Sequence, residues 1–202
     1  MSSEKRPYRK KKRAELEAET RRRITESAVE LHGTVGPSRT SMSAVAERAG
    51  VPRSTLYRHF PDEAALFEAC SSHWSAANPP PDITAWAAIP DPDERLQIAL
   101  DEMYAYWRRT ERMMENLIRD EATHENVRRH FGAFHAYIDA ATDILMGGRT
   151  LRGRPRARTK AVIGHALAFS TWRSLVREQG LDEAVAAELM SGLVASDRRP
   201  RV

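Results

Sequence analysis

The chain has 202 residues, of which 41% are hydrophobic, and a formal net charge of +4. This length and apolar content fit one or two globular domains with a packed core. The single cysteine, Cys70, excludes a disulfide framework within one chain, and no apolar run is long enough to span a bilayer. We therefore expect a cytoplasmic protein that is neither secreted nor embedded in a membrane.

Positive charge is concentrated near the N-terminus. Residues 1–60 hold 14 Lys and Arg against 7 Asp and Glu, whereas residues 61–202 hold 18 against 21. This asymmetry places a surface for a polyanion on the N-terminal third and favours nucleic acid over membrane. The segment 1–13 is polar and strongly basic, which predicts a disordered arm. Such an arm either contacts DNA phosphates or the minor groove, or is a solvated tail that adds only non-specific affinity.

The first helix is predicted over about residues 14–32. Ile24, Ala28 and Leu31 recur at helical spacing, and glutamates in its first turns suit the helix dipole. Glycine and proline in residues 33–37 end this helix and form a loop.

Residues 41–60 read as two short helices joined by a tight turn. Ser41 is suited to cap the first of them, which ends near Ala49. Gly50 fits a helix end that needs positive φ, and Pro52 fits the first position of the next helix. Val51 precedes the proline and is pushed out of the α region, so the helix breaks there.

The second of these helices has one apolar arc and one polar arc. Leu56 and Phe60 share the apolar arc at about 100° per residue. Thr55 and His59 lie on the flank, and the opposite arc consists of Arg53, Ser54, Tyr57 and Arg58. Donors on a short helix with an apolar back are what reading a DNA major groove requires. The alternative is an ordinary αα-corner with a solvated polar face.

Residues 22–69 resemble the TetR family of bacterial transcription regulators. The resemblance rests on the patterns Thr40-Ser41-Met42-x-x-Val45-Ala46, Ala49-Gly50-Val51, Thr55-Leu56-Tyr57-x-His59-Phe60 and Asp62-x-x-x-Leu66-Phe67. It implies an all-α protein in which a three-helix, helix-turn-helix DNA-binding domain precedes a helical domain for ligand binding and dimerisation.

The resemblance also implies DNA contacts for individual residues. Phosphate contacts are implied for Thr40 or Ser41, Tyr57 and His59, and base-edge contacts for Ser43, Arg53, Ser54 and Thr55. Arg58 joins this set because it lies on the polar arc. One position departs from the family: Glu63 stands where many members have a lysine, so we expect no phosphate contact there.

The rest of the chain also reads as helical. We expect the DNA-binding domain to cover residues 14–75, including a connecting helix from Asp62, and the helical domain to cover residues 76–202. Within the latter, residues 76–92 are proline-rich and predict a loop, and residues 113–119 predict a short separate helix. Five arginines between positions 149 and 158 suggest either a solvated loop or a second nucleic-acid patch.

The last two helices, about residues 156–179 and 182–196, have apolar residues on more than one face. Such a wide apolar arc must pack against the core of its own chain and also against a second surface. A second copy of the chain is the simplest candidate for that surface. The second helix is rich in small residues: Ala184, Ala186, Ala187, Ser191, Gly192 and Ala195. The resemblance likewise implies a homodimer formed through these two helices, which would read an inverted repeat in double-stranded DNA.

The resemblance implies a pocket for a small-molecule effector in the helical domain. Each aromatic or methionine side chain there reads individually as core, but as a set they are candidates to line the pocket: Trp86, Met103, Tyr106, Trp107, Met114, Phe131, Phe134, His135 and Trp172. An effector would act by favouring a conformation in which the two DNA-binding domains of the dimer are at the wrong distance for the operator, which lowers the affinity for DNA.

No catalytic, metal or cofactor motif is present in the sequence. His124 and His130 are six residues apart, so they do not share the helix face that a zinc-protease motif needs, and both are expected at the surface. We expect a bacterial, nucleoid-associated repressor released by an unknown effector, and not an enzyme. A transcriptional activator and a sequence-tolerant architectural DNA binder remain alternatives, with a helical enzyme behind them.

Overall fold

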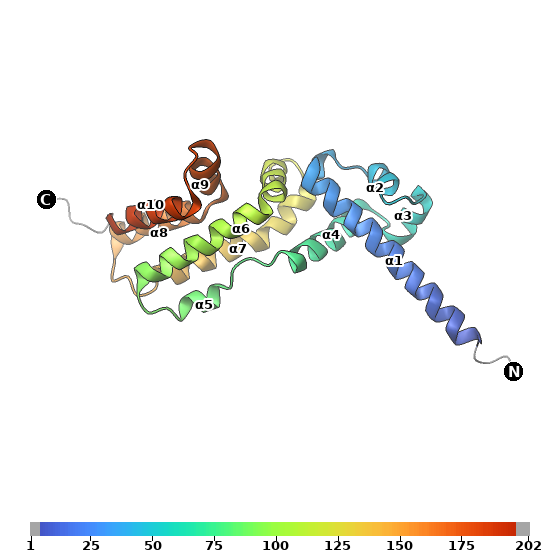
Figure 1. The fold of residues 1–202 in the computed structure, drawn as a ribbon, viewed down its shortest axis with the longest axis horizontal. Coiled ribbons are helices and arrows are strands. Elements are labelled where there is room, and N and C mark those ends of the chain that lie inside the picture. Colours follow the sequence, from blue (N-terminus) through green and yellow to red (C-terminus); the bar gives the residue numbers. More distant parts are fainter. Residues whose placement is uncertain (1–4, 197–202) are drawn as a thin grey trace. The chain divides into compact units, whose positions relative to one another are not determined.

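The computed structural model describes residues 5–196, with side chains from residue 8 onward. Every regular element in this range is helical, which confirms the predicted all-α class. The elements, shown in Figure 1, are α1 (Lys5–Thr34), η1 (Pro37–Arg39), α2 (Met42–Arg48), α3 (Arg53–His59), α4 (Glu63–Ala77), α5 (Ile83–Ala87), α6 (Pro92–Glu121), α7 (Glu125–Met146), α8 (Gly153–Leu167), α9 (Phe169–Trp172), the π-helical segment η2 (Arg173–Glu178) and α10 (Glu183–Ser196).

The chain divides into two compact units. Unit 1 consists of residues 1–79 and 115–130, and unit 2 of residues 80–114 and 131–202. The expected division near residue 75 therefore omits the end of α6 and the start of α7, which belong with the N-terminal unit. The sequence analysis placed residues 115–130 in the helical domain of residues 76–202 because all of that part of the chain has helical patterns.

Unit 1 is built on a small core shared by α1, α2, α3 and α4. Its fully or nearly fully buried members are Ile24, Ala28, Val45, Ala46, Ala49, Leu56, Phe60, Leu66 and Cys70. Their burial places the apolar arc of α3 against α1 and α2, as the periodicity predicts. The small Ala46 lies in this core, 2% exposed, where bulkier side chains would keep neighbouring helices apart.

Local hydrogen bonds explain where the short helices begin and turn. The Ser41 hydroxyl accepts a hydrogen bond from the amide of Ala44 (3.2 Å) and caps α2. Gly50 has φ of 62° and allows the chain to leave α2. Pro52 is the residue before α3 and not its first residue, with ψ of 146°.

Helix α1 begins earlier than predicted. It starts at Lys5 instead of Ala14, so residues 5–13 are helical where a disordered arm was expected, and residues 1–4 of that arm lie outside the described residues. Lysine and arginine are good helix formers, and Arg13 forms an i,i+4 ion pair with Glu17 (3.1 Å). These local preferences allow α1 to continue beyond its packed part towards the N-terminus.

In unit 2, α6 and α7 meet through Arg95, Trp107 and Tyr137, and α8 packs on α10 (Figure 1). The predicted short helix over residues 113–119 is instead part of the 30-residue α6. Residues 83–87 form α5 within the predicted loop, and its Trp86 is 1% exposed. No helix in residues 5–196 is long and apolar enough to cross a membrane.

Two further predictions for unit 2 need correction. The predicted helix over residues 156–179 is interrupted at Ala168, whose ψ is 140°; the Thr171 hydroxyl donates to the carbonyl of His165 (2.6 Å) and satisfies it at the break. Arg149, expected in a solvated loop, is buried. Its guanidinium donates to Asp93 Oδ1 (2.9 Å) and to the carbonyl of Pro92 (2.6 Å), so it ties two segments together.

Candidate nucleic-acid interface

The polar arc of α3 is exposed as predicted. Arg53, Ser54, Tyr57 and Arg58 face solvent, whereas Leu56 and Phe60 are 0% exposed. The guanidinium of Arg53 lies 5.9 Å from the ring centroid of Tyr57. Helix α3 therefore presents two guanidiniums and a phenol from one side of a helix that is held by its other side, a geometry suited to a groove of DNA.

At the start of α2, the structure distinguishes between the two hydroxyls that the sequence left as alternatives. Thr40 donates its hydroxyl proton to the carbonyl of Gly36 (2.8 Å) and is half-buried. Ser41 is exposed and only accepts in its cap, so its proton is available to a phosphate. Ser43, two residues after Ser41, is also exposed. Ser41 is thus better placed than Thr40 to donate to DNA.

Arg21 on α1 holds the end of α3, a role that the sequence did not reveal. Its guanidinium donates to the carbonyl of His59 (2.7 Å) and lies 4.1 Å from the centre of the Phe60 ring. A cation at a helix C-terminus interacts favourably with the helix dipole. The sequence does not distinguish Arg21 from its neighbours, because three arginines follow one another at this point. Only the way in which α1 crosses α3 places Arg21, and not the other two, at the end of α3.

His59 is half-buried at the same place, and its Nε2 is buried without a hydrogen-bond partner. Burial lowers the pKa of His59, helped by the neighbouring charges of Arg58 and Arg21 and opposed by Glu17. The surroundings of His59 thus favour its neutral form, whereas a bound phosphate would favour the charged form.

Glu63 has a partner inside unit 1. Its carboxylate lies 3.0 Å from Nε2 of His124, and His130 pairs in the same way with Glu68 (2.7 Å). Both histidines were expected at the surface, but their side chains are only 14% and 25% exposed. The prediction was wrong because it considered one helix alone, and α4 covers this face. The departure at Glu63 therefore serves the packing of α4.

These histidines belong to a cluster around one aromatic ring. The Phe67 centroid lies 5.4 Å from that of His32, 5.8 Å from that of His124 and 5.0 Å from that of His130. Burial lowers the pKa of His32 to about 4, and the neighbouring His124 contributes to this shift. His32 is consequently neutral at physiological pH and packs as an uncharged ring.

Cys70 lies next to this cluster. Its thiol donates to the carbonyl of Phe67 (3.2 Å) and lies 3.4 Å from Nδ1 of His32. Burial raises the pKa of Cys70 to about 12, so the thiol stays protonated and unreactive. A buried, protonated thiol fits a packed helix residue and does not fit a redox sensor.

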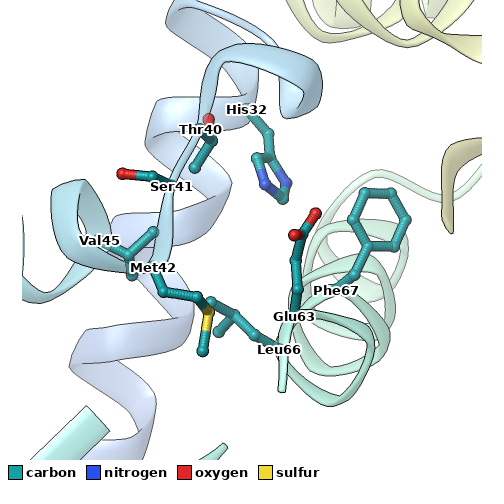
Figure 2. Close-up of a pocket in the computed structure, with 8 residues that line it drawn as sticks. All are labelled: His32, Thr40, Ser41, Met42, Val45, Glu63, Leu66 and Phe67. Carbon is teal, nitrogen blue, oxygen red and sulfur yellow. The ribbon is translucent and has the colours of Figure 1, made fainter. Parts of the chain in front are cut away.

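Figure 2 shows a small pocket between the end of α1, the start of α2 and α4, lined by His32, Thr40, Ser41, Met42, Val45, Glu63, Leu66 and Phe67. The Glu63 carboxylate points towards the His32 ring, while the Ser41 hydroxyl points away from the pocket (Figure 2). Its cavity volume is about 10 Å³, which is room for one water molecule at most. It is a packing space and not an effector site.

The aromatic side chains proposed for the effector pocket lie together in unit 2. Trp107 contacts Tyr106, Phe134 and Phe169 with centroids 5.2 to 5.7 Å apart. Trp86, Met103, Met114, Phe131 and Trp172 are buried, Phe134 is half-buried, and His135 is exposed although its ring meets Phe131. Sequence reasoning missed Phe169, Tyr137 and Glu102; Glu102 accepts the indole N–H of Trp86 (2.7 Å). Trp172 Nε1 is buried without a partner.

Comparisons with known proteins agree with this geometry. Residues 24–70 match the model of the family of bacterial regulatory proteins, tetR family. A search of curated proteins finds no match. Among solved structures, a TetR-like transcriptional regulator from Rhodococcus sp. is 20% identical with a TM-score of 0.63, covering 87% of this chain and 93% of that one.

Two further solved structures are similar in fold. NalD, the secondary repressor of a multidrug efflux pump in Pseudomonas aeruginosa, is 19% identical with a TM-score of 0.58, covering 91% of this chain and 97% of its own. FadR from Thermus thermophilus, a repressor in complex with lauroyl-CoA, is 21% identical with a TM-score of 0.54, covering 90% and 96%. The resemblance seen in the sequence is thus confirmed: residues 24–70 match the tetR family of bacterial regulatory proteins, and the chain has a TetR-like, all-α fold.

Proposed function

We propose that this regulator is a homodimeric transcriptional repressor that binds an inverted-repeat operator and is released from it by a small molecule. The observation that carries the proposal is the exposed polar face of α3, held rigidly from behind by Leu56 and Phe60. Binding chromosomal DNA would place the protein at the nucleoid, in the bacterial cytoplasm.

The proposed DNA contacts follow from exposure and chemistry. Arg53 is suited to pair with a guanine edge, with Ser43, Ser54 and Thr55 as further base contacts. Ser41, Tyr57, Arg58 and His59 would bind phosphates, with Thr40 supporting the loop. These roles would orient α3 in the major groove.

A second copy of the chain is the proposed partner for α10. Val185, Leu189 and Leu193 recur every four residues on this helix and are 50%, 52% and 50% exposed. Of the small residues, Ala186 and Ala187 are 0% exposed and pack within the chain, whereas Ala184, Gly192 and Ala195 are exposed. An apolar stripe beside small residues fits a self-complementary helical interface. The small residues are evident in the sequence, whereas this stripe emerges from the exposure of its side chains.

The proposed effector site is the aromatic cluster of unit 2. The unpaired indole N–H of Trp172 is a donor in apolar surroundings, which suits a mainly apolar ligand that has one acceptor group. The solved structure of FadR is a complex with lauroyl-CoA, whose lauroyl group is an apolar chain that ends in a carbonyl acceptor. The candidate lining remains Trp86, Met103, Tyr106, Trp107, Met114, Phe131, Phe134, His135 and Trp172.

The function is tested by selecting duplexes from a random DNA pool with the full chain. We expect enrichment of an inverted repeat whose half-sites are about one or more helical turns apart. Enrichment without any preferred sequence would contradict the proposal and favour an architectural binder. A promoter fusion in cells then separates a repressor from an activator, and compounds that release the selected operator identify the effector class.

Arg53→Ala should weaken binding to the selected operator by about 1 to 3 kcal/mol, because it removes a bidentate pair of hydrogen bonds to guanine. Binding to scrambled DNA should change little. Arg129→Ala is the matched control, since this exposed arginine pairs with Glu125 on its own helix, away from α3. Gel shifts on both DNAs measure the effect, and equal losses on operator and scrambled DNA would reduce Arg53 to a phosphate contact.

Leu189→Glu should convert the dimer to a monomer, because it places a charge in the centre of the proposed interface. Light scattering after size exclusion measures the mass directly. Ile118→Glu replaces another exposed apolar residue, 41% exposed on α6, and should leave the mass unchanged. A Leu189 variant that keeps the mass of the wild type would exclude this face as the interface.

A further inference from the structure

Helix α1 extends far beyond the core of unit 1. Its buried side chains begin at Ile24, whereas residues 8–19 are all exposed. At a rise of 1.5 Å per residue, about 24 Å of helix separates Tyr8 from Ile24. Figure 1 shows this N-terminal half projecting past α3 and α4. Such a length of helix contributes nothing to the core, so its sequence needs another explanation.

The exposed half of α1 carries a run of five cations, Arg9, Lys10, Lys11, Lys12 and Arg13. Arg13 pairs with Glu17, while within the described part of the chain the other four form no ion pair. Like charges at neighbouring helical positions repel each other by a few tenths of a kcal/mol per pair. An anionic partner would remove this cost, and the ordered helix would present the charges without a further loss of conformational entropy.

The direction of this half is fixed by the contacts of α1 with α3. Arg21 donates to the carbonyl of His59 at 2.7 Å, and the negative charge of Glu17 acts to raise the pKa of His59. At about 100° per residue, Lys10 lies within about 20° of the direction of Arg21, and Lys11 and Arg13 within about 80°. These three residues, here called the basic face, lie on the side of α1 that contacts the end of α3. Lys12 lies on the opposite side, at about 180°, and Arg9 lies at about 120°, outside the basic face.

That end of α3 carries the side chains proposed to bind phosphates. Tyr57 and His59 belong to its last turn, and Arg13 lies about 12 Å and Lys10 about 16 Å further along α1 from Arg21. Each DNA strand has one phosphate per 3.4 Å of helix axis, so this distance spans about four phosphates. A helix leaving the reading head at this point would therefore pass along the DNA backbone just outside the bases read by α3.

We propose that the basic face of α1, formed by Lys10, Lys11 and Arg13, is a second DNA-binding surface that contacts the phosphate backbone flanking each half-site. This inference rests on the proposed reading of DNA by α3. The expected disordered arm is thus a helix from Lys5 onward, so the distance of its charges from α3 is fixed. The only large apolar residues of positions 8–19 are Tyr8 and Leu16, which are too few to form the wide stripe of a membrane-surface helix. DNA is therefore the partner that the charge pattern favours.

The test compares two double variants of the same helix. Lys10→Gln with Lys11→Gln removes two charges from the basic face, and Arg9→Gln with Lys12→Gln removes two from outside that face. Glutamine keeps the helix propensity. Affinities are measured between 50 and 200 mM salt on the selected operator with long flanks and on the same operator trimmed at its ends. If selection yields no operator, a random-sequence duplex with long flanks and one with short flanks are used.

On the long duplex, the basic-face variant should reduce the salt dependence of log K by about 0.9 for each phosphate that a lysine no longer neutralises. If both lysines neutralise a phosphate, the wild type should lose about 12-fold more affinity than this variant between 50 and 200 mM salt, counted for one DNA-binding domain of the dimer. The Arg9 and Lys12 variant should stay close to the wild type. On the trimmed duplex all three proteins should converge, because the flanking phosphates are absent.

Equal losses in the two variants would overturn the proposal in favour of diffuse attraction by a charged helix. A loss that is the same on long and trimmed DNA would overturn the flanking position, and stronger effects on phosphatidylserine vesicles than on DNA would favour a membrane surface. The proposed sequence-specific binding by α3 is tested separately. It would be contradicted if the wild type bound operator and scrambled DNA equally well.

Discussion

Replacing Phe60 by alanine is expected to lower the free energy of unfolding by about 3 to 5 kcal/mol, the usual cost of removing a buried phenylalanine ring. Phe60 is 0% exposed, and its ring also carries the guanidinium of Arg21. Its loss leaves a cavity behind α3 and removes the surface on which Arg21 rests. Urea unfolding followed by circular dichroism measures the change.

Tyr57→Ala is the matched control for this prediction. Tyr57 lies on the same helix but is 41% exposed, so its removal should change the stability by less than about 1 kcal/mol. DNA affinity should nevertheless fall, because the phenol is a proposed phosphate contact. If both variants lose the same stability, the separation of α3 into a supporting face and a reading face is wrong.

Helices α2 and α3 and the turn between them were predictable, because the sequence patterns that specify them lie within a few residues. The burial of Leu56 and Phe60 follows from their spacing, and the cap at Ser41 and the turn at Gly50 follow from residue chemistry. A short amphipathic helix can bury only one side, so the exposure of Arg53 was fixed at the same time. Periodicity within a few residues was sufficient here.

Contacts between distant segments could not be predicted in this way. His124 meets Glu63 across 61 positions of sequence, and Arg21 meets His59 across 38. Each pair depends on how two helices cross, which neither helix specifies alone. For the same reason Arg149 was taken for a loop residue, although it is buried against Asp93.

The length of α1 shows a different limit. Charge and the presence of Pro7 suggested disorder for residues 1–13, because a polar segment buries too little surface to fold alone. A helix that is already nucleated by its packed part can grow at much lower cost than a new one. The packing of Ile24 and Ala28 on the head therefore supports helical residues that never contact the core.

The last expected result concerns acid. His32 has a folded-state pKa of about 4 and an unperturbed value of 6.5, so between these pH values the unfolded chain binds a proton that the folded chain does not. Stability is therefore complete above about pH 6.5 and falls as the pH drops towards 4. This difference between the folded and unfolded pKa of His32 corresponds to at most about 3 to 4 kcal/mol of stability, since each pKa unit is worth about 1.4 kcal/mol.

Urea unfolding at pH 7, 6, 5 and 4.5 should show this loss in the wild type and a flatter profile in His32→Phe, which keeps an aromatic ring against Phe67 but cannot be protonated. His32→Gln guards against a phenylalanine that fits poorly, because it too lacks the titration. His73→Gln changes an exposed histidine of α4 and should leave the profile as in the wild type. Parallel profiles in the wild type and both His32 variants would mean that His32 is not the buried, neutral imidazole on which the cluster around Phe67 depends.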